Sequence, residues 1–168
     1  MTRLVIVGAP GAGKSSVGQR VADSMGVEFI DTDRLIEERA GKSVGDIFVS
    51  DGEAAFRALE ARAVIDAMST DGAVVSLGGG AVLDPSTRSA LADQPVVWLQ
   101  VSLGDATKRV GLGTARPLLL GNVRGTLLRL LDERTPLYDE VATWTVDTDG
   151  RSLDEVAADV MSIVEGVS

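Results

Sequence analysis

The sequence predicts an α/β fold in which helices cover both faces of a doubly wound parallel sheet, giving three layers. Short runs of β-branched residues alternate along the chain with longer segments of helical periodicity, and this alternation is typical of right-handed βαβ crossovers. Two of the runs, 73–77 and 95–101, are apolar on both faces, as expected for the central strands of a parallel sheet.

The individual elements follow from the same patterns. The expected strands are short apolar or β-branched runs: 3–7, 28–30, 73–77, 95–101 and 142–146. The expected helices carry apolar residues at helical spacing between or after these strands: 14–25, 34–40, 53–68, 86–92, 105–110, 126–132 and 153–164. Residues 111–125 break the pattern, because they hold four glycines, one proline and two arginines without a clear period. A loop of this length in a small domain is either functional or disordered, and we interpret it as a mobile lid.

We expect all of these elements to form one domain over residues 1–168. The chain shows no internal repeat and no low-complexity linker, and a domain of this length buries roughly two thirds of the surface that its unfolded chain exposes. With 45% hydrophobic and 24% charged residues, the chain has enough apolar surface to fold, which excludes intrinsic disorder as its main description.

Composition also excludes several functions. The net charge of -9 argues against a nucleic-acid or membrane-surface partner, since such proteins are usually basic. Without cysteine or histidine, the chain has no disulfide, no thiol nucleophile and no imidazole base, so proton transfer must use carboxylates, lysine, tyrosine or water. The apolar run 4–7 is too short for a signal peptide, and no stretch approaches the ~20 apolar residues that span a membrane. We therefore expect a cytoplasmic protein.

A phosphate-binding loop follows the first expected strand. Residues 8–15, GAPGAGKS, fit the pattern G-x-x-x-x-G-K-[ST] in the strand–turn–helix context that this pattern requires. Glycines let backbone N–H groups surround phosphate oxygens, and the helix N-terminus adds a favourable dipole. Lys14 supplies a positive charge to the β- and γ-phosphates, and the Ser15 hydroxyl can bind Mg²⁺. The motif predicts nucleotide binding.

Two aspartates follow the second expected strand, in the segment Asp31-Thr32-Asp33. Such residues cap helices, but carboxylates at the carboxyl end of a strand also lie where open α/β sheets bind ligands. Either aspartate can therefore cap the next helix, while the other holds Mg²⁺ through water or accepts the proton of a substrate hydroxyl.

Two further segments leave alternatives open. Ser50 and Glu53 have the spacing of a capping box, which indicates a structural role for Glu53. Arg57 and Glu60 stand three residues apart and can touch; they form either a solvated surface pair, worth a few tenths of a kcal/mol, or a cleft pair in which Glu60 orients Arg57 for a carboxylate. Three glycines at 78–80 form either a loose turn or a close approach to a substrate.

The chain resembles the shikimate kinases, a P-loop family of the nucleoside monophosphate kinase type, in six motifs: GAPGAGKSS, DTD, GEAAFRALE, SLGGG, RPLL and ERTPLY. The motifs occur in that family's order over essentially the whole chain. The resemblance implies transfer of the ATP γ-phosphate to the 3-hydroxyl of shikimate, with Mg²⁺ as cofactor. It also implies a five-stranded parallel sheet in the order 2-3-1-4-5.

The resemblance assigns the donor side of the site. Asp31 would hold Mg²⁺ through water, and Arg116 in the lid would close over the phosphates as a catalytic residue beside Lys14. Arg109 and Arg151 resemble the residues that flank adenine. The phosphate-binding residues, with Ser15 also on the metal, would be Gly11, Ala12, Gly13, Lys14, Ser15 and Ser16.

The resemblance also places shikimate near residues 31–61. Asp33 would bind the hydroxyls of shikimate and act as the catalytic base. Arg57, oriented by Glu60, and Arg134 would bind the carboxylate. The remaining residues expected to contact shikimate are Phe48, Phe56, Gly78, Gly79 and Gly80.

Other functions remain as alternatives at this stage. Another small-molecule kinase of this fold, acting on gluconate or a nucleotide, would need a different acceptor pocket and need not retain GE-x-x-FR-x-x-E. A non-catalytic nucleotide-binding module should have lost Lys14, Asp33 or an arginine, and none of these is missing. We expect a monomer whose partner is the small molecule shikimate.

Overall fold

The structure is a computed structural model that describes residues 1–111 and 122–166. Its centre is a parallel sheet of five strands in the order β2-β3-β1-β4-β5. The strands are β1 (Leu4–Val7), β2 (Phe29–Asp31), β3 (Val74–Ser76), β4 (Val96–Gln100) and β5 (Trp144–Asp147). The predicted fold class and strand order are therefore confirmed.

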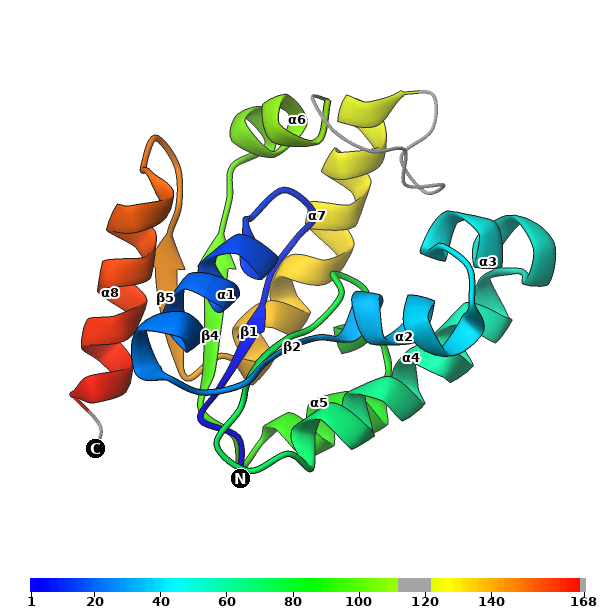
Figure 1. The fold of residues 1–168 in the computed structure, drawn as a ribbon. Coiled ribbons are helices and arrows are strands. Elements are labelled where there is room, and N and C mark those ends of the chain that lie inside the picture. The colour runs from blue at the N-terminus through cyan, green and yellow to red at the C-terminus, as the bar shows by residue number, and fades with distance from the viewer. Residues whose placement is uncertain (112–121, 167–168) are drawn as a thin grey trace.

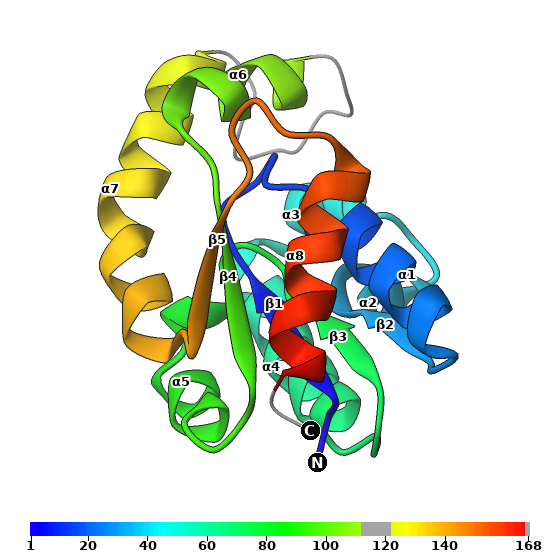
Figure 2. The ribbon, with the colours of Figure 1, turned by 90° about the vertical axis from the view of Figure 1, so that its left-hand side faces the viewer.

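Helices cover both faces of this sheet (Figure 1 and Figure 2). One face carries α1 (Lys14–Met25) and α8 (Leu153–Glu165), which pack against each other. The other face carries α4 (Glu53–Met68), α5 (Pro85–Leu91) and α7 (Val123–Val141). Because both faces are covered, every residue of β1 and β3 is buried, as is typical of central strands.

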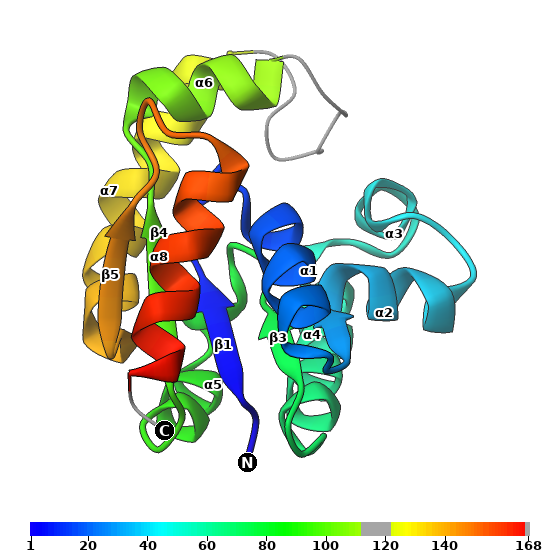
Figure 3. The same cartoon turned by 60° about the vertical axis from the view of Figure 1, so that its left-hand side comes forward.

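A second, smaller core lies beside the β2 edge of the sheet. Helices α2 (Thr32–Ala40) and α3 (Val44–Asp51) project from this edge (Figure 3), and we call them the α2–α3 arm. The arm packs on α4 around four buried side chains: Ile36, Ile47, Phe56 and Ala63. The arm therefore has a hydrophobic core separate from that of the sheet.

Three sequence-based expectations about the elements were wrong. Helix α3 was not predicted; Ser43 caps it by accepting the Asp46 N–H at 3.1 Å, and its Ile47 is buried. The expected capping box does not form, because Ser50 lies inside α3, where its hydroxyl donates to the Asp46 carbonyl. Helix α4 instead begins after Gly52, without a side-chain cap.

The third difference concerns α7, which was expected to end at residue 132. It continues through Pro136 to Val141, although an internal proline removes one backbone hydrogen bond and clashes with the preceding turn. Buried side chains on both sides of Pro136, among them Leu130 and Tyr138, hold the two halves of the helix against the sheet. Burial therefore outweighs the local preference for a break.

Of the lid expected at 111–125, residues 112–121 with Arg116 lie outside the described residues. The ends of that prediction were wrong, because residue 111 ends a helix and residues 123–125 begin α7. Before this segment lies α6 (Leu103–Gly111), at the carboxyl end of the sheet (Figure 3). The short 3₁₀ helix η1 (Ala81–Leu83) joins β3 to α5. Within the described ranges, no helix is both long and apolar enough to cross a membrane.

Candidate functional site

The phosphate-binding loop joins the carboxyl end of β1 to the start of α1. Gly13 takes the N-cap position of α1 at φ 87° and ψ 21°, a left-handed conformation that favours glycine. No side chain of the described residues caps this helix, and the backbone N–H groups of its first turn are suited to an anion. Lys14 folds back over the loop and donates to the Ala9 carbonyl at 3.1 Å.

Asp31 caps α2 and also contacts the phosphate-binding loop. Its Oδ1 accepts the Asp33 N–H at 3.0 Å and caps α2. Its Oδ2 accepts the hydroxyl hydrogen of Ser15 at 2.6 Å, so the same carboxylate connects α2 with the phosphate-binding loop. Asp33 lies in the first turn of α2.

The pair Ser15 and Asp31 fits Mg²⁺. Mg²⁺ prefers oxygen ligands, keeps several waters and takes the rest from one or two carboxylates and substrate phosphates. A hydroxyl and a carboxylate oxygen 2.6 Å apart beside the loop supply that kind of donor set. Among the described residues, no group of three or more acidic side chains could hold a metal alone.

Arg57 and Glu60 form a largely buried ion pair, which excludes the interpretation of a solvated surface pair. Arg57 NH1 lies 2.8 Å from Glu60 Oε1, and the two side chains are 23% and 5% exposed. Burial raises the pKa of the Glu60 carboxyl above its usual range, and the Arg57 guanidinium only partly offsets this effect. Glu53, once expected to cap a helix, lies on the other side of Arg57 at 3.5 Å.

The glycines 78–80, which we call the glycine loop, pass between these charged groups. A Cβ built on Gly78 would lie 2.6 Å from Asp33 Oδ1 and 2.9 Å from Glu60 Oε2. A Cβ on Gly80 would lie 2.5 Å from Arg57 NH1. These separations are shorter than real Cβ contacts, so only glycine lets the backbone pass here without moving the charged groups.

The glycine loop also lies close to the phosphate-binding loop. A Cβ on Gly79 would lie 3.1 Å from Pro10 Cδ of the phosphate-binding loop and 3.5 Å from Arg134 NH1. Arg134 comes from α7 and is 4% exposed. The fold thus brings the phosphate-binding loop, the glycine loop and a buried arginine together at Gly79.

Two arginines beside the glycine loop each carry a buried donor that lacks a partner among the described residues. Within the described residues, the Nε atoms of Arg57 and Arg134 have no hydrogen-bond acceptor. Buried guanidinium N–H groups rarely remain unsatisfied, and a carboxylate is the acceptor that suits a guanidinium best. The two arginines are therefore suited to an anionic acceptor molecule.

Phe48 and Phe56 lie together, as expected for an apolar wall. Their ring centroids are 4.7 Å apart, with Phe48 on α3 and Phe56 on α4. The Arg57 guanidinium carbon lies 5.3 Å from the Phe56 ring centroid, so the aromatic pair borders the charged part of the site. The unpredicted helix α3 is what brings Phe48 to this position.

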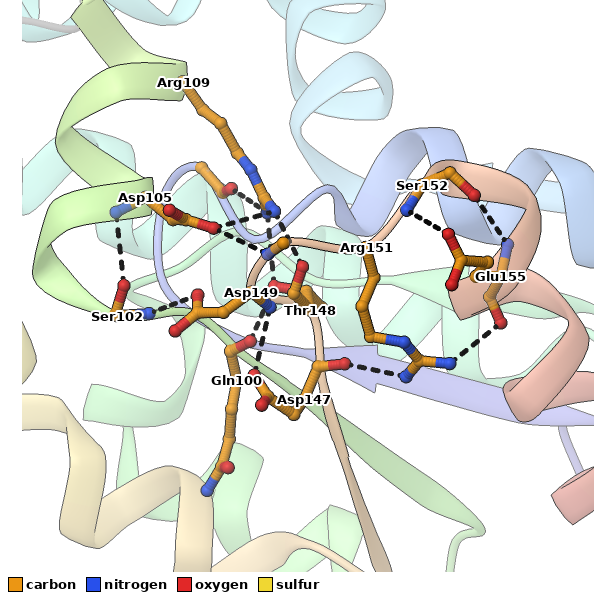
Figure 4. A network of polar contacts seen from close by, with 12 residues as sticks. Gln100, Ser102, Asp105, Arg109, Asp147, Thr148, Asp149, Arg151, Ser152 and Glu155 are labelled. Atoms are coloured by element: carbon orange, nitrogen blue, oxygen red, sulfur yellow. Dashed lines mark hydrogen bonds and ion pairs between the residues drawn. The ribbon is translucent and has the colours of Figure 1, made fainter.

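The two arginines expected beside adenine differ in their surroundings (Figure 4). Arg109 of α6 donates to the carbonyls of Gly11 at 3.0 Å and Thr148 at 2.9 Å, so it connects the phosphate-binding loop with the turn after β5. Arg151 instead donates to the Asp147 carbonyl at 2.9 Å and pairs with Asp159 of α8 at 2.6 Å. Arg109 thus contacts the phosphate-binding loop, whereas Arg151 contacts the end of β5 and helix α8.

Sequence reasoning gave no role to Thr32 or Tyr138, and both contact the glycine loop. The Thr32 hydroxyl accepts the Gly78 N–H at 3.2 Å, and the Tyr138 hydroxyl donates to the Gly79 carbonyl at 2.6 Å. Both residues lie inside motifs noted in the sequence, DTD and ERTPLY. The signal that could have pointed to Thr32 and Tyr138 was a polar side chain on the buried face of a helix.

Replacing Glu60 with Gln should remove a pH dependence from the stability of the protein. The folded-state pKa of Glu60 lies above 4.5, so the folded chain retains this proton to higher pH than the unfolded chain. The stabilising contribution of Glu60 to the free energy of unfolding is therefore complete below pH 4.5. This contribution is lost as the pH rises through the folded-state pKa of Glu60. Glu60→Gln does not titrate and should lack this decline.

Urea unfolding from about pH 4 to about pH 8 measures this effect. The matched control is Glu53→Gln, since Glu53 also lies beside Arg57 but its side chain is 56% exposed. We expect Glu53→Gln to show the same pH dependence of the free energy of unfolding as the parent. Parallel pH profiles for the parent and Glu60→Gln would contradict the prediction.

Comparison with known proteins identifies the family. The family model described as "SKI: Shikimate kinase" matches residues 10–165. The shikimate kinase of Thermobifida fusca is 55% identical over 153 residues, which cover 91% of this chain and 89% of that protein. The shikimate kinase of Mycobacterium tuberculosis is 45% identical over 161 residues, covering 95% and 92% respectively.

Solved structures agree with this result. A shikimate kinase from Acinetobacter baumannii, solved in complex with shikimate, superposes with a TM-score of 0.93 at 32% identity, covering 98% of this chain and 94% of that one. A gluconokinase from Sinorhizobium meliloti superposes with a TM-score of 0.58 at 24% identity, which shows a shared fold alone. The chain therefore belongs to the shikimate kinase family and is an enzyme with shikimate kinase activity.

Proposed function

We propose that this enzyme transfers the γ-phosphoryl group of ATP to the 3-hydroxyl of shikimate, with Asp33 as base and Mg²⁺ bound at Ser15 and, through water, at Asp31. The observation that carries the proposal is the pair of buried Nε atoms on Arg57 and Arg134 that lack an acceptor among the described residues. The Acinetobacter baumannii relative solved with shikimate supports the same acceptor for this chain.

On the donor side, backbone N–H groups of residues 11–16 hold the phosphates at the N-terminus of α1. Lys14 neutralises charge between the β- and γ-phosphates. When bound, Mg²⁺ neutralises charge that develops on the phosphate oxygens, and the Ser15 hydroxyl and the Asp31 carboxylate are the groups that hold it. Arg109, between Gly11 and Thr148, borders the nucleotide.

On the acceptor side, the guanidinium groups of Arg57 and Arg134 bind the shikimate carboxylate. Glu60 holds Arg57 in one orientation through their 2.8 Å contact. Backbone N–H groups of Gly79 and Gly80 meet the substrate, and the rings of Phe48 and Phe56 border its apolar side.

The chemical step needs one proton acceptor. As the 3-hydroxyl oxygen bonds to the γ-phosphorus, its proton passes to Asp33, and the bond between that phosphorus and the β,γ-bridging oxygen breaks to release ADP. The short distances from Gly78 to Asp33 Oδ1 and from Gly79 to Pro10 support this step, because both Asp33 and the phosphate-binding loop lie beside the same short glycine loop.

Charge neutralisation and positioning dominate such a reaction. The chain is acidic overall, at -9, so the positive charge required by two anionic ligands must be gathered locally. Lys14, Arg57 and Arg134 supply it around the glycine loop. An acidic exterior with a basic centre suits an enzyme for small anions rather than for nucleic acid.

The test is ADP release from Mg²⁺-ATP with shikimate, gluconate or CMP as acceptor. We expect strong release with shikimate alone. Release with gluconate or CMP instead would overturn the acceptor assignment and leave only the phosphate-binding half of the site. ATP binding without release in any reaction would overturn the proposal as a whole.

Replacing Asp31 with Asn should raise the Mg²⁺ concentration needed for half-maximal activity by about 10-fold or more. Asn caps helices as well as Asp does, so α2 should remain folded, while the negative charge near the metal is lost. A Mg²⁺ titration at saturating ATP measures the effect. The control is Asp93→Asn, an exposed aspartate at the opposite end of the sheet; equal Mg²⁺ dependence of the two variants would remove Asp31 from the metal site.

A further inference from the structure

We propose that Tyr138 is a positioning residue for the acceptor: its hydroxyl fixes the peptide between Gly79 and Gly80, so that the glycine loop presents its N–H groups to the substrate. The Tyr138 hydroxyl donates to the Gly79 carbonyl at 2.6 Å, and the residue is 1% exposed. The inference rests on the proposed function, because it takes the glycine loop as part of the shikimate site.

Peptide geometry explains how one hydrogen bond can orient a donor. The Gly79 carbonyl and the Gly80 N–H belong to the same planar trans peptide and point in opposite directions. Fixing the carbonyl toward α7 therefore directs the Gly80 N–H away from Tyr138. Glycine at both positions leaves this peptide free to rotate unless a contact holds it.

A second hydroxyl holds the preceding part of the loop. Thr32 accepts the Gly78 N–H at 3.2 Å and donates to the Ser76 carbonyl at 3.3 Å. Thr32 of α2 and Tyr138 of α7 thus hold the two peptides that flank the peptide between Gly78 and Gly79. Both contacts come from neutral groups, which restrain the loop without adding charge beside Asp33 and Arg57.

Helix geometry connects this role to the carboxylate site. Tyr138 lies four residues after Arg134 on α7, so both side chains project from the same helix face. One helix therefore supplies a guanidinium for the substrate and a hydroxyl for the loop that borders it. The continuation of α7 past Pro136 is what makes this arrangement possible.

The Tyr138 ring packs on Trp98 at a centroid distance of 5.9 Å, and the residue also lines a pocket of about 340 Å³ together with Leu131 and Thr135. The hydroxyl joins this ring to the glycine loop through its hydrogen bond to the Gly79 carbonyl. Burial raises the pKa of Tyr138 to about 12, so the hydroxyl stays protonated and remains a donor at any ordinary assay pH.

The test is Tyr138→Phe, which keeps the ring and removes one oxygen. We expect the KM for shikimate to rise about 3- to 10-fold, the worth of one hydrogen bond, while the KM for ATP changes by less than about twofold. The rise should be the same from about pH 6 to about pH 9, since the phenol does not titrate there.

The matched control is Thr143→Val, which removes a hydroxyl that accepts the Val96 N–H at 3.1 Å, at the opposite end of the sheet. A merely structural role for Tyr138 predicts that both variants lose thermal stability and keep the shikimate KM. That result, or an equal rise in both KM values for Tyr138→Phe, would overturn the inference. If Tyr138→Phe did not fold, Thr32→Val should give the same separation of the two KM values, and a normal shikimate KM in that variant would count against the restraint.

Arg57→Ala, measured alongside, separates this inference from the proposed function. A raised shikimate KM in Arg57→Ala with an unchanged one in Tyr138→Phe overturns only the role of Tyr138. Unchanged values in both variants would place the acceptor elsewhere and overturn the proposed site itself.

Discussion

Replacing Asp33 with Asn is expected to lower kcat by about two to four orders of magnitude, the range typical for loss of a positioned general base. The amide has the shape of the carboxylate but cannot take the proton of the 3-hydroxyl. ATP affinity should stay within about twofold of the parent, because phosphate binding depends on the loop at 8–15 and on Lys14. Steady-state kinetics and equilibrium ATP binding measure the two effects separately.

The matched control is Asp46→Asn. Asp46 occupies the first turn of α3 as Asp33 occupies the first turn of α2, so both substitutions remove an acidic residue near a helix N-terminus. We expect Asp46→Asn to keep the parental kcat. If Asp33→Asn retained kcat within about threefold, Asp33 would have no part in proton transfer.

Replacing Arg57 with Ala should mainly weaken acceptor binding. Truncating one partner of a buried charge pair typically costs about 2 to 5 kcal/mol, and the 23% exposure of the Arg57 side chain places the expected effect at the lower end. We expect the KM for shikimate to rise about 30-fold, which corresponds to about 2 kcal/mol. The KM for ATP should change little.

Two further variants make this result specific. Arg57→Lys keeps the charge but loses the planar fork that binds a carboxylate, so its shikimate KM should lie between those of the parent and Arg57→Ala. Arg39→Ala removes an arginine paired with Asp66 on the surface, where both side chains are 43% exposed, and should leave both KM values unchanged. An Arg57→Ala enzyme with a normal shikimate KM would place Arg57 outside the acceptor site.

Much of this architecture was predictable because its signals are local. The apolar runs at 73–77 and 95–101 predicted central strands, and the strands β3 and β4 lie there in a parallel sheet. The spacing of glycines before Lys14 predicted a phosphate-binding loop, since that backbone shape depends on residues adjacent in the chain. The strand order came from the resemblance to a family rather than from periodicity.

The tertiary structure decided what depends on contacts between distant residues. Arg57 and Glu60 read equally well as a surface pair or a cleft pair, and only their burial beside the glycine loop separates the two. The bond from Tyr138 to Gly79 joins residues 59 positions apart, so no local pattern could predict it. Helix α7 passes Pro136 because burial on both sides outweighs a local preference. Short-range spacing thus determined the strands and the phosphate-binding loop, whereas long-range packing decided which polar side chains are buried together.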